Sequence, residues 1–501
     1  MRRPIPVLQA TAALVLVSAT GVAASPQEVD PLVQVSPTGS PFRGATAHGP
    51  PCAGVPPGAQ TGRNFPGTAV EPWVVVNPAN PTNLVGGWQQ DRWSNGGATA
   101  LVFAYTQDAG RTWHQSVQPK FTRCTGGTAA NGGDYERASD PWVSIAPNGH
   151  AYAMSLSFDA PNDVSAMLVA TSTDGGRTWG PTVTLRRDTS QNVLNDKNSL
   201  TADNSNANYA YTVWDRLEFP TKQAKKKAGE HEVGHRGPTW FSRTTDSGAS
   251  WEPTRKIYDP GEADQTIGNR IVQTRSGALV NGFDLIYNIK KTHKVSSRNV
   301  AVLRSTDRGA TWTSATIVDK LQSVGVKDPT TGKPVRTGDM LPEFAVDPRN
   351  ETVYAVWQDA RSTGGARNQI AVAKSTDGGS TWTTVSYAIN NVHLTQAFNP
   401  AIRVQPDGTI GVLYQDFRDD DGAAPLVTST WLLQSHDGGN TWDETKVGAD
   451  FNMTGAPVAG GYFLGDYMGL GATSGAFHLF FARATGSAAV PASNIYSTTF
   501  R

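Results

Sequence analysis

The sequence contains little cysteine, little charge and no long apolar run beyond its first residues. Charged residues make up only 17% of the 501, and 43 basic residues balance 43 acidic ones. Because a neutral chain has no overall field to attract phosphates, a nucleic-acid-binding function is disfavoured. No internal apolar stretch approaches the ~20 residues of a membrane-spanning helix. We therefore expect no membrane span in the mature protein.

The first residues have the features of an export signal. Arg2 and Arg3 precede an apolar stretch, Ile5 to Ala24, and the small residues Val22-Ala23-Ala24 suit a cleavage site. We expect residues 1–24 to be a signal peptide and the protein to be secreted into the extracellular space.

The chain has only two cysteines, Cys52 and Cys124. In an oxidising compartment this pair favours one disulfide; two unrelated free thiols are the alternative. If it forms, the disulfide links the Pro/Gly-rich N-terminal arm, residues 25–70, to the following domain.

Glycine and tryptophan are plentiful, and much of both belongs to a repeat. The pattern Asp-x-Gly-x-[Ser/Thr]-Trp occurs six times, starting at Asp108, Asp174, Asp246, Asp307, Asp377 and Asp437. The aspartates are 60 to 72 residues apart, a period typical of repeat architectures. An Asp side chain can accept N–H groups two residues on, and Gly supplies a positive φ. We interpret these boxes as structural turns, each with a tryptophan packed beneath it.

Apolar runs separated by turn residues recur with the boxes, which is a hairpin pattern. They start near residues 71, 140, 197, 269, 343, 399 and 466, and no window sustains a helical period. Hairpin, strand, box and strand make a four-stranded unit, so the sequence predicts an all-β fold, a β-propeller over residues 71–501. Seven blades are favoured, with six as the alternative. The last unit has three strands, and residues 32–36 of the arm are a candidate for its fourth.

The boxes at this spacing resemble the Asp-box (BNR) repeats of sialidases and related secreted glycan-processing propellers. The resemblance covers nearly the whole mature chain. It is specific for the fold and weak for activity, because non-enzymatic propellers also carry the box.

The resemblance implies a set of catalytic residues in the second half of the chain. Sialidases use a Tyr nucleophile, a Glu that takes its proton, and arginines that bind the substrate carboxylate. Tyr467 in GDYMGL matches the Tyr, and Glu343 matches the Glu. Arg361 and Arg418 match the arginines.

The first half departs from that pattern. Where sialidases have Arg-Ile-Pro, this chain has Glu71 in EPWVV, and the nearest Arg-Ile begins at Arg270. Arg92 and Arg270 are candidate substrate-binding residues in place of the missing arginine, and Asp91 is a candidate acid. A glutamate near the axis would suit a neutral sugar or a cation such as Ca²⁺ better than an acid sugar. The Asp–Arg pairs at the ends of second strands can equally well be structural. In that interpretation they are salt bridges that hold neighbouring blades together.

Two further patterns resemble metal-binding motifs but lack what those motifs require. Residues 231–235 fit His-Glu-x-x-His, but the surrounding glycines and charges offer no apolar helix face for a zinc protease. Residues 419–422 lack the ligands of an EF-hand at the required positions. We therefore predict no metal site. Ca²⁺ is kept as the one alternative cofactor.

The sequence thus predicts a secreted, monomeric glycoside hydrolase of sialidase type that releases terminal sugars, sialic acid among them, from extracellular glycans. One alternative is a non-catalytic propeller that binds carbohydrate or protein. The other is a propeller exo-glycosidase or polysaccharide lyase with a different substrate.

Overall fold

The computed structural model describes residues 28–42, 62–160, 164–222, 236–289, 294–388, 395–422, 425–485 and 492–501. The elements of this part are strands and four short 3₁₀ segments, which confirms the all-β prediction. The 3₁₀ segments are Arg123–Thr125, Ala129–Asn131, Arg361–Thr363 and Met453–Gly455. No helix in these ranges is long and apolar enough to cross a membrane. The predicted signal peptide and the residues 231–235 lie outside them.

Seven four-stranded antiparallel units account for most of the strands. The first three are β2 (Ala69–Asn77), β3 (Asn80–Arg92), β4 (Ala98–Thr106) and β5 (His114–Gln115); β6 (Arg137–Ile145), β7 (Ala151–Asp159), β8 (Val164–Ser172) and β9 (Val183–Asp188); and β10 (Val193–Ala202), β11 (Ala210–Glu218), β12 (Thr239–Thr244) and β13 (Arg255–Tyr258). One pairing, Ala98 with Ala138, joins the first two units into a continuous sheet.

The remaining units follow the same order. They are β14 (Gln265–Gln273), β15 (Leu279–Ile289), β16 (Lys294–Ser305) and β17 (Thr316–Lys320); β20 (Glu343–Val346), β21 (Val353–Asp359), β22 (Gln369–Ser375) and β23 (Ser386–Tyr387); β24 (Ala397–Val404), β25 (Ile410–Asp416), β26 (Val427–Ser435) and β27 (Asp443–Lys446), with β28 (Phe451–Asn452) beside β26; and β30 (Gly469–Thr473), β31 (Ala476–Ala484) and β32 (Ser493–Phe500) with β1 (Val33–Gln34). A small extra sheet combines β18 (Val326–Lys327), β19 (Pro334–Arg336) and β29 (Tyr462–Phe463).

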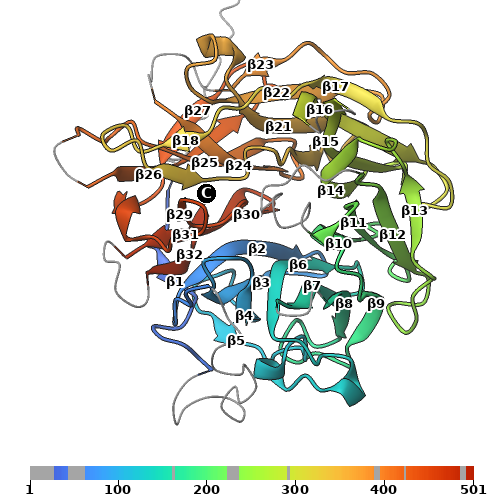
Figure 1. Cartoon of the computed structure of the whole chain (residues 1–501). Coiled ribbons are helices and arrows are strands. Elements are labelled where there is room, and N and C mark those ends of the chain that lie inside the picture. The colour runs from blue at the N-terminus through green and yellow to red at the C-terminus, as the bar shows by residue number, and fades with distance from the viewer. Residues whose placement is uncertain are drawn as a thin grey trace, which may run out of the picture.

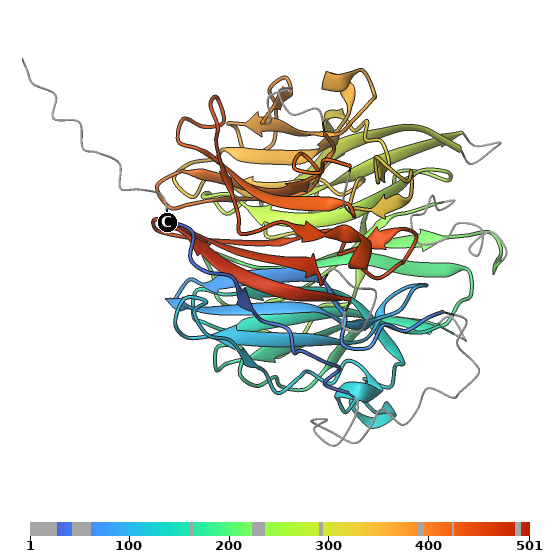
Figure 2. The same cartoon turned by 90° about the vertical axis from the view of Figure 1, so that its left-hand side faces the viewer.

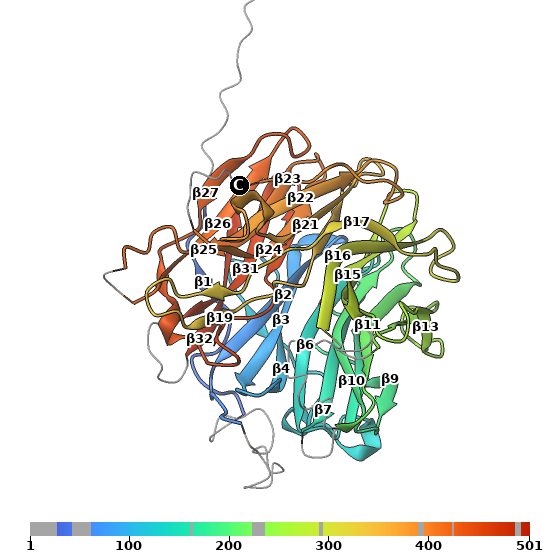
Figure 3. The same cartoon turned by 45° about the horizontal axis from the view of Figure 1, so that its top comes forward.

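The first strands of the seven units surround a common centre. They pack against one another in the cyclic order β2, β6, β10, β14, β20, β24, β30 and back to β2. Figure 1 looks along this centre, with the later strands of each unit towards the rim. In the tilted view of Figure 3 the strands of successive units stand side by side.

The two ends of the chain meet in the last unit. β1 pairs antiparallel with β32, and Val33 lies opposite Ser497. Figure 2 shows this N-terminal segment running along the C-terminal strands. Backbone hydrogen bonds join Glu28 and Arg501 in both directions, at 3.1 and 3.0 Å. The last sheet is therefore completed by residues more than 450 positions away in the sequence.

Large aromatic side chains on the second strands fill the space between sheets. Trp88, Trp214 and Trp357 are all fully buried. Each indole N–H has a partner: Trp88 donates to Gln90 at 2.8 Å, and Trp357 to Asp359 at 3.1 Å. Burying a Trp with its N–H satisfied retains the full benefit of its apolar surface.

The six Asp boxes share one hydrogen-bond arrangement, seen clearly around Asp307. Its carboxylate accepts the backbone N–H of Thr311 at 2.9 Å and the Thr311 hydroxyl at 2.6 Å. The bonds therefore reach four residues on, two more than the sequence analysis expected. Ser305 completes the turn by donating to Asp307 and accepting the N–H of Gly309.

The boxes lie at one end of the strands, next to the turns between first and second strands. The backbone N–H of Ala109, inside the first box, donates to the backbone oxygen of Thr82, close to the start of β3. Third strands run towards this end and enter the boxes there, so the starts of the first strands lie at the opposite end. We call these the box end and the opposite end.

Cys124 is buried and is not a free thiol. Its expected partner, Cys52, lies outside the described residues, so the pairing stays a prediction.

Replacing Asp307 with Ala should lower the melting temperature at pH 7, because the turn loses a local acceptor like a helix cap, worth about 1 kcal/mol. The Thr311 hydroxyl and then its backbone N–H lower the pKa of Asp307 to about 2. A carboxyl group whose pKa is lowered by folding stabilises the fold at pH values above its pKa in the unfolded state. This stabilisation is lost as the pH falls. The difference from wild type should therefore shrink between about pH 4 and about pH 2. Thermal melts across this range check it, with the exposed Glu262→Gln as control; a pH-independent difference would contradict the explanation.

Candidate functional site

A two-residue bulge recurs near the start of five first strands. It falls at Glu71-Pro72, Asp140-Pro141, Lys197-Asn198, Gly268-Asn269 and Asn399-Pro400, where the pairing register shifts. The leading residue has a positive φ between 47° and 74° in every case. Four of these five are not glycine, and such backbone strain in non-glycine residues concentrates at functional sites.

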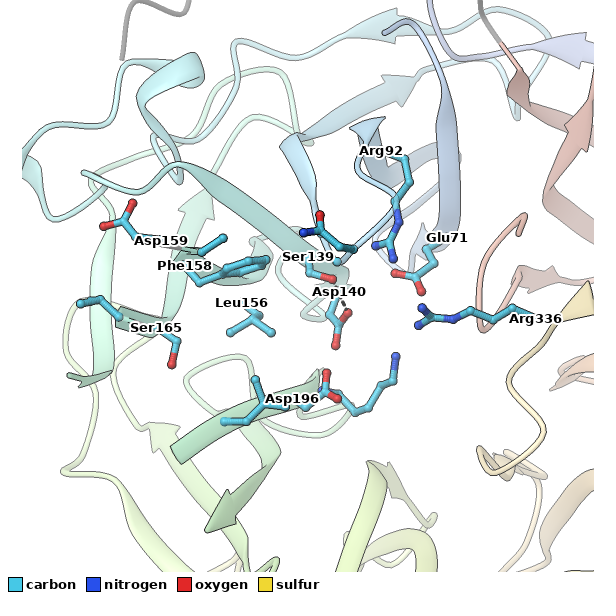
Figure 4. Close-up of a pocket in the computed structure, with 17 residues that line it drawn as sticks. Glu71, Arg92, Ser139, Asp140, Leu156, Phe158, Asp159, Ser165, Asp196 and Arg336 are labelled. Carbon is cyan, nitrogen blue, oxygen red and sulfur yellow. Dashed lines mark hydrogen bonds between the residues drawn. The ribbon is translucent and has the colours of Figure 1, made fainter. Parts of the chain in front are cut away.

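Three of these bulges, at Glu71, Asp140 and Lys197, line a cavity of about 230 Å³ at the opposite end. One side is charged, with Glu71, Asp140 and Asp196 among the residues that line it. Leu156 and Phe158 belong to an apolar wall. Figure 4 shows the carboxylates of Glu71, Asp140 and Asp196 and the guanidinium groups of Arg92 and Arg336 turned into the same space. An apolar wall opposite convergent polar groups is typical of small-molecule sites.

Asp466 joins the charges on two sides of this cavity. Arg336 binds it through two nitrogens, at 3.1 and 2.8 Å, and Lys197 binds it at 2.7 Å. Burial opposes the charge of Lys197, but Asp466 holds the lysine pKa well above its usual value. The ion cluster is therefore charged at neutral pH and fixes both cations in place.

Three acids face the cavity in different environments. Asp140 is 2% exposed; one of its oxygens accepts from Ser139 at 2.7 Å. The other has no partner among the described residues. Burial raises the pKa of Asp196 to about 7, against the attraction of Lys197. Burial also raises the pKa of Glu71 to about 8.

Glu71 is enclosed by donors from neighbouring elements. The side-chain amide of Gln89 donates to one of its oxygens, and the backbone N–H of Asp466 donates to the other at 3.4 Å. Glu71 is only 1% exposed, so its raised pKa keeps the acid neutral at pH 7.

Arg336 and Lys197 were absent from the sequence-based site. Arg336 ends β19, in the connection between the fourth and fifth units, and β19 pairs in parallel with β29 shortly before Asp466. This long-range pairing has no local sequence signal. The bulges did have a local sequence signal, because Glu-Pro-Trp, Asp-Pro-Trp and Asn-Pro occur at the starts of first strands.

Tyr467 and Glu343 line one small cavity but have different surroundings. Glu343 forms an ion pair with Arg270. The Tyr467 ring packs edge-on against Trp73 and Trp142, with centroids 6.1 and 5.7 Å away. Its hydroxyl has no partner within the described ranges, and burial followed by the charge of Glu71 raises its pKa well above the usual value.

The other predicted arginines divide between the cavity and the sheets. Arg92 lines the cavity and lies over the Phe463 ring, 4.7 Å from its centroid. Arg361 pairs with Asp359 and Asp319, and Arg418 with Asp416 and Glu444. Neither of these two lines the cavity, so the structure does not bring them together with Arg92.

Asp91 also points away from the cavity. Its carboxylate accepts from the hydroxyl of Ser40 and from the N–H of Gly67 at 2.6 Å. It therefore fixes the N-terminal arm to β3. Among the described residues, no group of three or more His, Cys, Asp or Glu is arranged to hold a metal ion.

Residues 223–458 match the family model of the BNR repeat-like domain. This stretch contains four of the six boxes and confirms the resemblance to Asp-box propellers. No curated protein matches the chain.

Solved structures similar to this chain include several carbohydrate-acting enzymes. The Hadza microbial sialidase Hz136 is 14% identical, with a TM-score of 0.46 over 81% of this chain and 75% of that one. The α-L-arabinanase of Penicillium chrysogenum, solved with arabinobiose, is 12% identical, with a TM-score of 0.45 over 94% and 98%. A PL25 ulvan lyase is 14% identical, with a TM-score of 0.45 over 72% and 78%.

Glu71→Gln should stabilise the protein at alkaline pH, because it keeps the shape of the neutral acid and cannot ionise. A raised carboxyl pKa means that stability falls as pH rises from about 4.5 towards about 8. The melting temperature of the variant should therefore rise relative to that of wild type as the pH increases through this range. At still higher pH it should remain above the wild-type value. Glu262→Gln, on the surface, is the control. An unchanged difference between pH 5 and pH 9 would contradict the neutral Glu71.

Proposed function

We propose that the seven units are the blades of one closed β-propeller and that the protein is a secreted carbohydrate-active enzyme. Two observations support the closed ring: the cyclic packing of the first strands and a single box-end cavity lined by all seven. The BNR match and the opposite-end cavity support action on glycans. Export rests on the signal-like residues 1–24.

The reaction we propose is hydrolysis of a glycosidic bond by two carboxyl groups. Glycosidases pair an acid of raised pKa with an ionised carboxylate. Asp196 fits the acid, since its pKa of about 7 lies near neutral pH. Asp140 fits the carboxylate, because one of its buried oxygens faces the cavity without a partner. This unpartnered oxygen carries the proposal.

The proton transfers follow from these assignments. Asp196 gives its proton to the glycosidic oxygen as the bond to the anomeric carbon breaks. Asp140 stabilises the positive charge that develops on that carbon, and a water molecule supplies the new hydroxyl. Neutral Glu71 keeps a third negative charge out of the cluster. The anomeric form of the product shows whether Asp140 acts as nucleophile or as base.

The cavity favours a single terminal sugar. Its volume of about 230 Å³ lies below the ~300–1,000 Å³ of drug-sized ligand sites. Phe158 and Leu156 offer an apolar wall for the C–H face of a sugar ring, and the charged side offers hydroxyl partners. Arg336 already binds Asp466 through two nitrogens, and Lys197 binds the same carboxylate. Neither cation is therefore a ready two-pronged partner for a sugar carboxylate, which favours an uncharged sugar over sialic acid.

Asp196→Asn and Asp140→Asn should each lower kcat at least ~10²-fold, the usual scale for general acid–base groups. In wild type, kcat/KM should fall as pH rises above about 7, because Asp196 loses its proton. A release assay over fluorogenic glycosides, neutral and sialic, measures both effects. Exposed Asp450→Asn controls for charge. Sugar binding with no release from any glycoside would favour the non-catalytic alternative.

Sialidase-type chemistry at Tyr467 is the second candidate. It is favoured by the buried Tyr467 hydroxyl without a partner in the described chain. The raised pKa of this hydroxyl and the ion pair that occupies Glu343 oppose it.

Tyr467→Phe separates the two candidates. Under the carboxyl mechanism this variant keeps kcat within about threefold, because the ring packing on Trp73 and Trp142 survives. Loss of turnover with an unchanged melting temperature would favour the tyrosine mechanism instead. Trp142→Phe serves as the packing control in the same assay.

A further inference from the structure

A second cavity occupies the centre of the molecule at the box end. Its volume is about 430 Å³, and the first strands of all seven units line it. Most of its wall is aliphatic, with Val76, Ile271 and Val404 as examples. Trp73 and Trp142 stack with ring centroids 3.8 Å apart and also line it. Trp73 follows Glu71 by two residues on β2, so these rings lie between this cavity and the opposite-end cavity that Glu71 lines.

Two arginines enter this apolar space. The Arg270 guanidinium lies 4.6 Å from the Trp73 ring centroid, and that of Arg403 lies 5.0 Å from the same centroid. Arg270 is paired with Glu343. Arg403 donates to the backbone oxygen of Ile402 at 2.7 Å. No carboxylate in the described part of the chain forms a salt bridge with it.

The charges in the cavity therefore do not balance. Two guanidinium groups meet one carboxylate in a mostly apolar enclosure, and burial lowers the pKa of Arg403 to about 10. Nearby polar side chains do not compensate: Thr201 donates to the backbone oxygen of Ile271, and Ser144 accepts from Ala202. Arg403 is partly buried, and a cation that has lost part of its hydration favours an accompanying anion.

We propose that the box-end cavity binds a small organic monoanion. Its carboxylate would form a two-pronged hydrogen-bonded pair with Arg403, and its apolar body would lie against the aliphatic wall and the Trp73 ring. Because one guanidinium group is without a carboxylate partner, we expect the ligand to carry a single negative charge. This site is separate from the opposite-end cavity, and the proposal does not depend on the proposed hydrolysis.

Isothermal titration calorimetry of the full chain with benzoate tests this proposal. Wild type should bind one benzoate per chain, and Arg403→Met, which keeps the stem over Trp73, should bind at least tenfold more weakly. Arg111→Gln, an exposed arginine of the first box, should bind like wild type. Benzyl alcohol, the uncharged analogue, should bind at least tenfold more weakly than benzoate.

A second variant guards against misfolding of Arg403→Met. Ala472→Phe narrows the cavity from β30 without touching either arginine, and it should also abolish benzoate binding. Absence of binding to wild type would overturn the proposal, as would equal affinity for Arg403→Met or for Ala472→Phe. Binding of sulfate with the same dependence on Arg403, but none of benzoate, would overturn the organic character of the ligand.

Discussion

A bulge near the start of the first strands, whose leading residue has a positive φ, is the constraint on which the opposite-end cavity depends. In a regular strand, successive side chains alternate between the two faces of the sheet. Each bulge sets two residues against one on the neighbouring strand, and this one extra residue breaks the alternation and helps to place Glu71, Asp140 and Lys197 around one cavity. A positive φ in a non-glycine residue costs roughly 1–3 kcal/mol, so the surrounding packing must hold it.

That packing comes from outside the bulges. Neighbouring units accept hydrogen bonds from them: Gln358 accepts the backbone N–H of Asn399 at 3.0 Å, and Asp215 accepts that of Gly268 at 2.8 Å. The Asp boxes fasten the other end of six of the seven units. Stability and chemistry are thus divided between the two ends of the same sheets, with Trp73 and Trp142 between them.

The sequence predicted the fold better than the site. Box spacing and hairpin patterns are local, so the all-β class and the strand order within each unit could be predicted. The site is assembled from distant segments: Arg336 meets Asp466 only because β19 and β29 pair. The resemblance pointed to Tyr467, Glu343 and the second-strand arginines. The hairpin pattern predicted only that strands begin near residues 140 and 197, and it gave Asp140 and Asp196 no role.

Carboxyl titration by ¹³C NMR tests the central claim, that the pocket keeps one accessible acid protonated near neutral pH. Aspartate-labelled wild type and Asp196→Asn would be compared from pH 3 to pH 9, and the signal lost in the variant belongs to Asp196. A midpoint near pH 7 is predicted from the burial of this side chain. A midpoint near the ordinary aspartate value of ~3.9 would contradict the acid–base assignment.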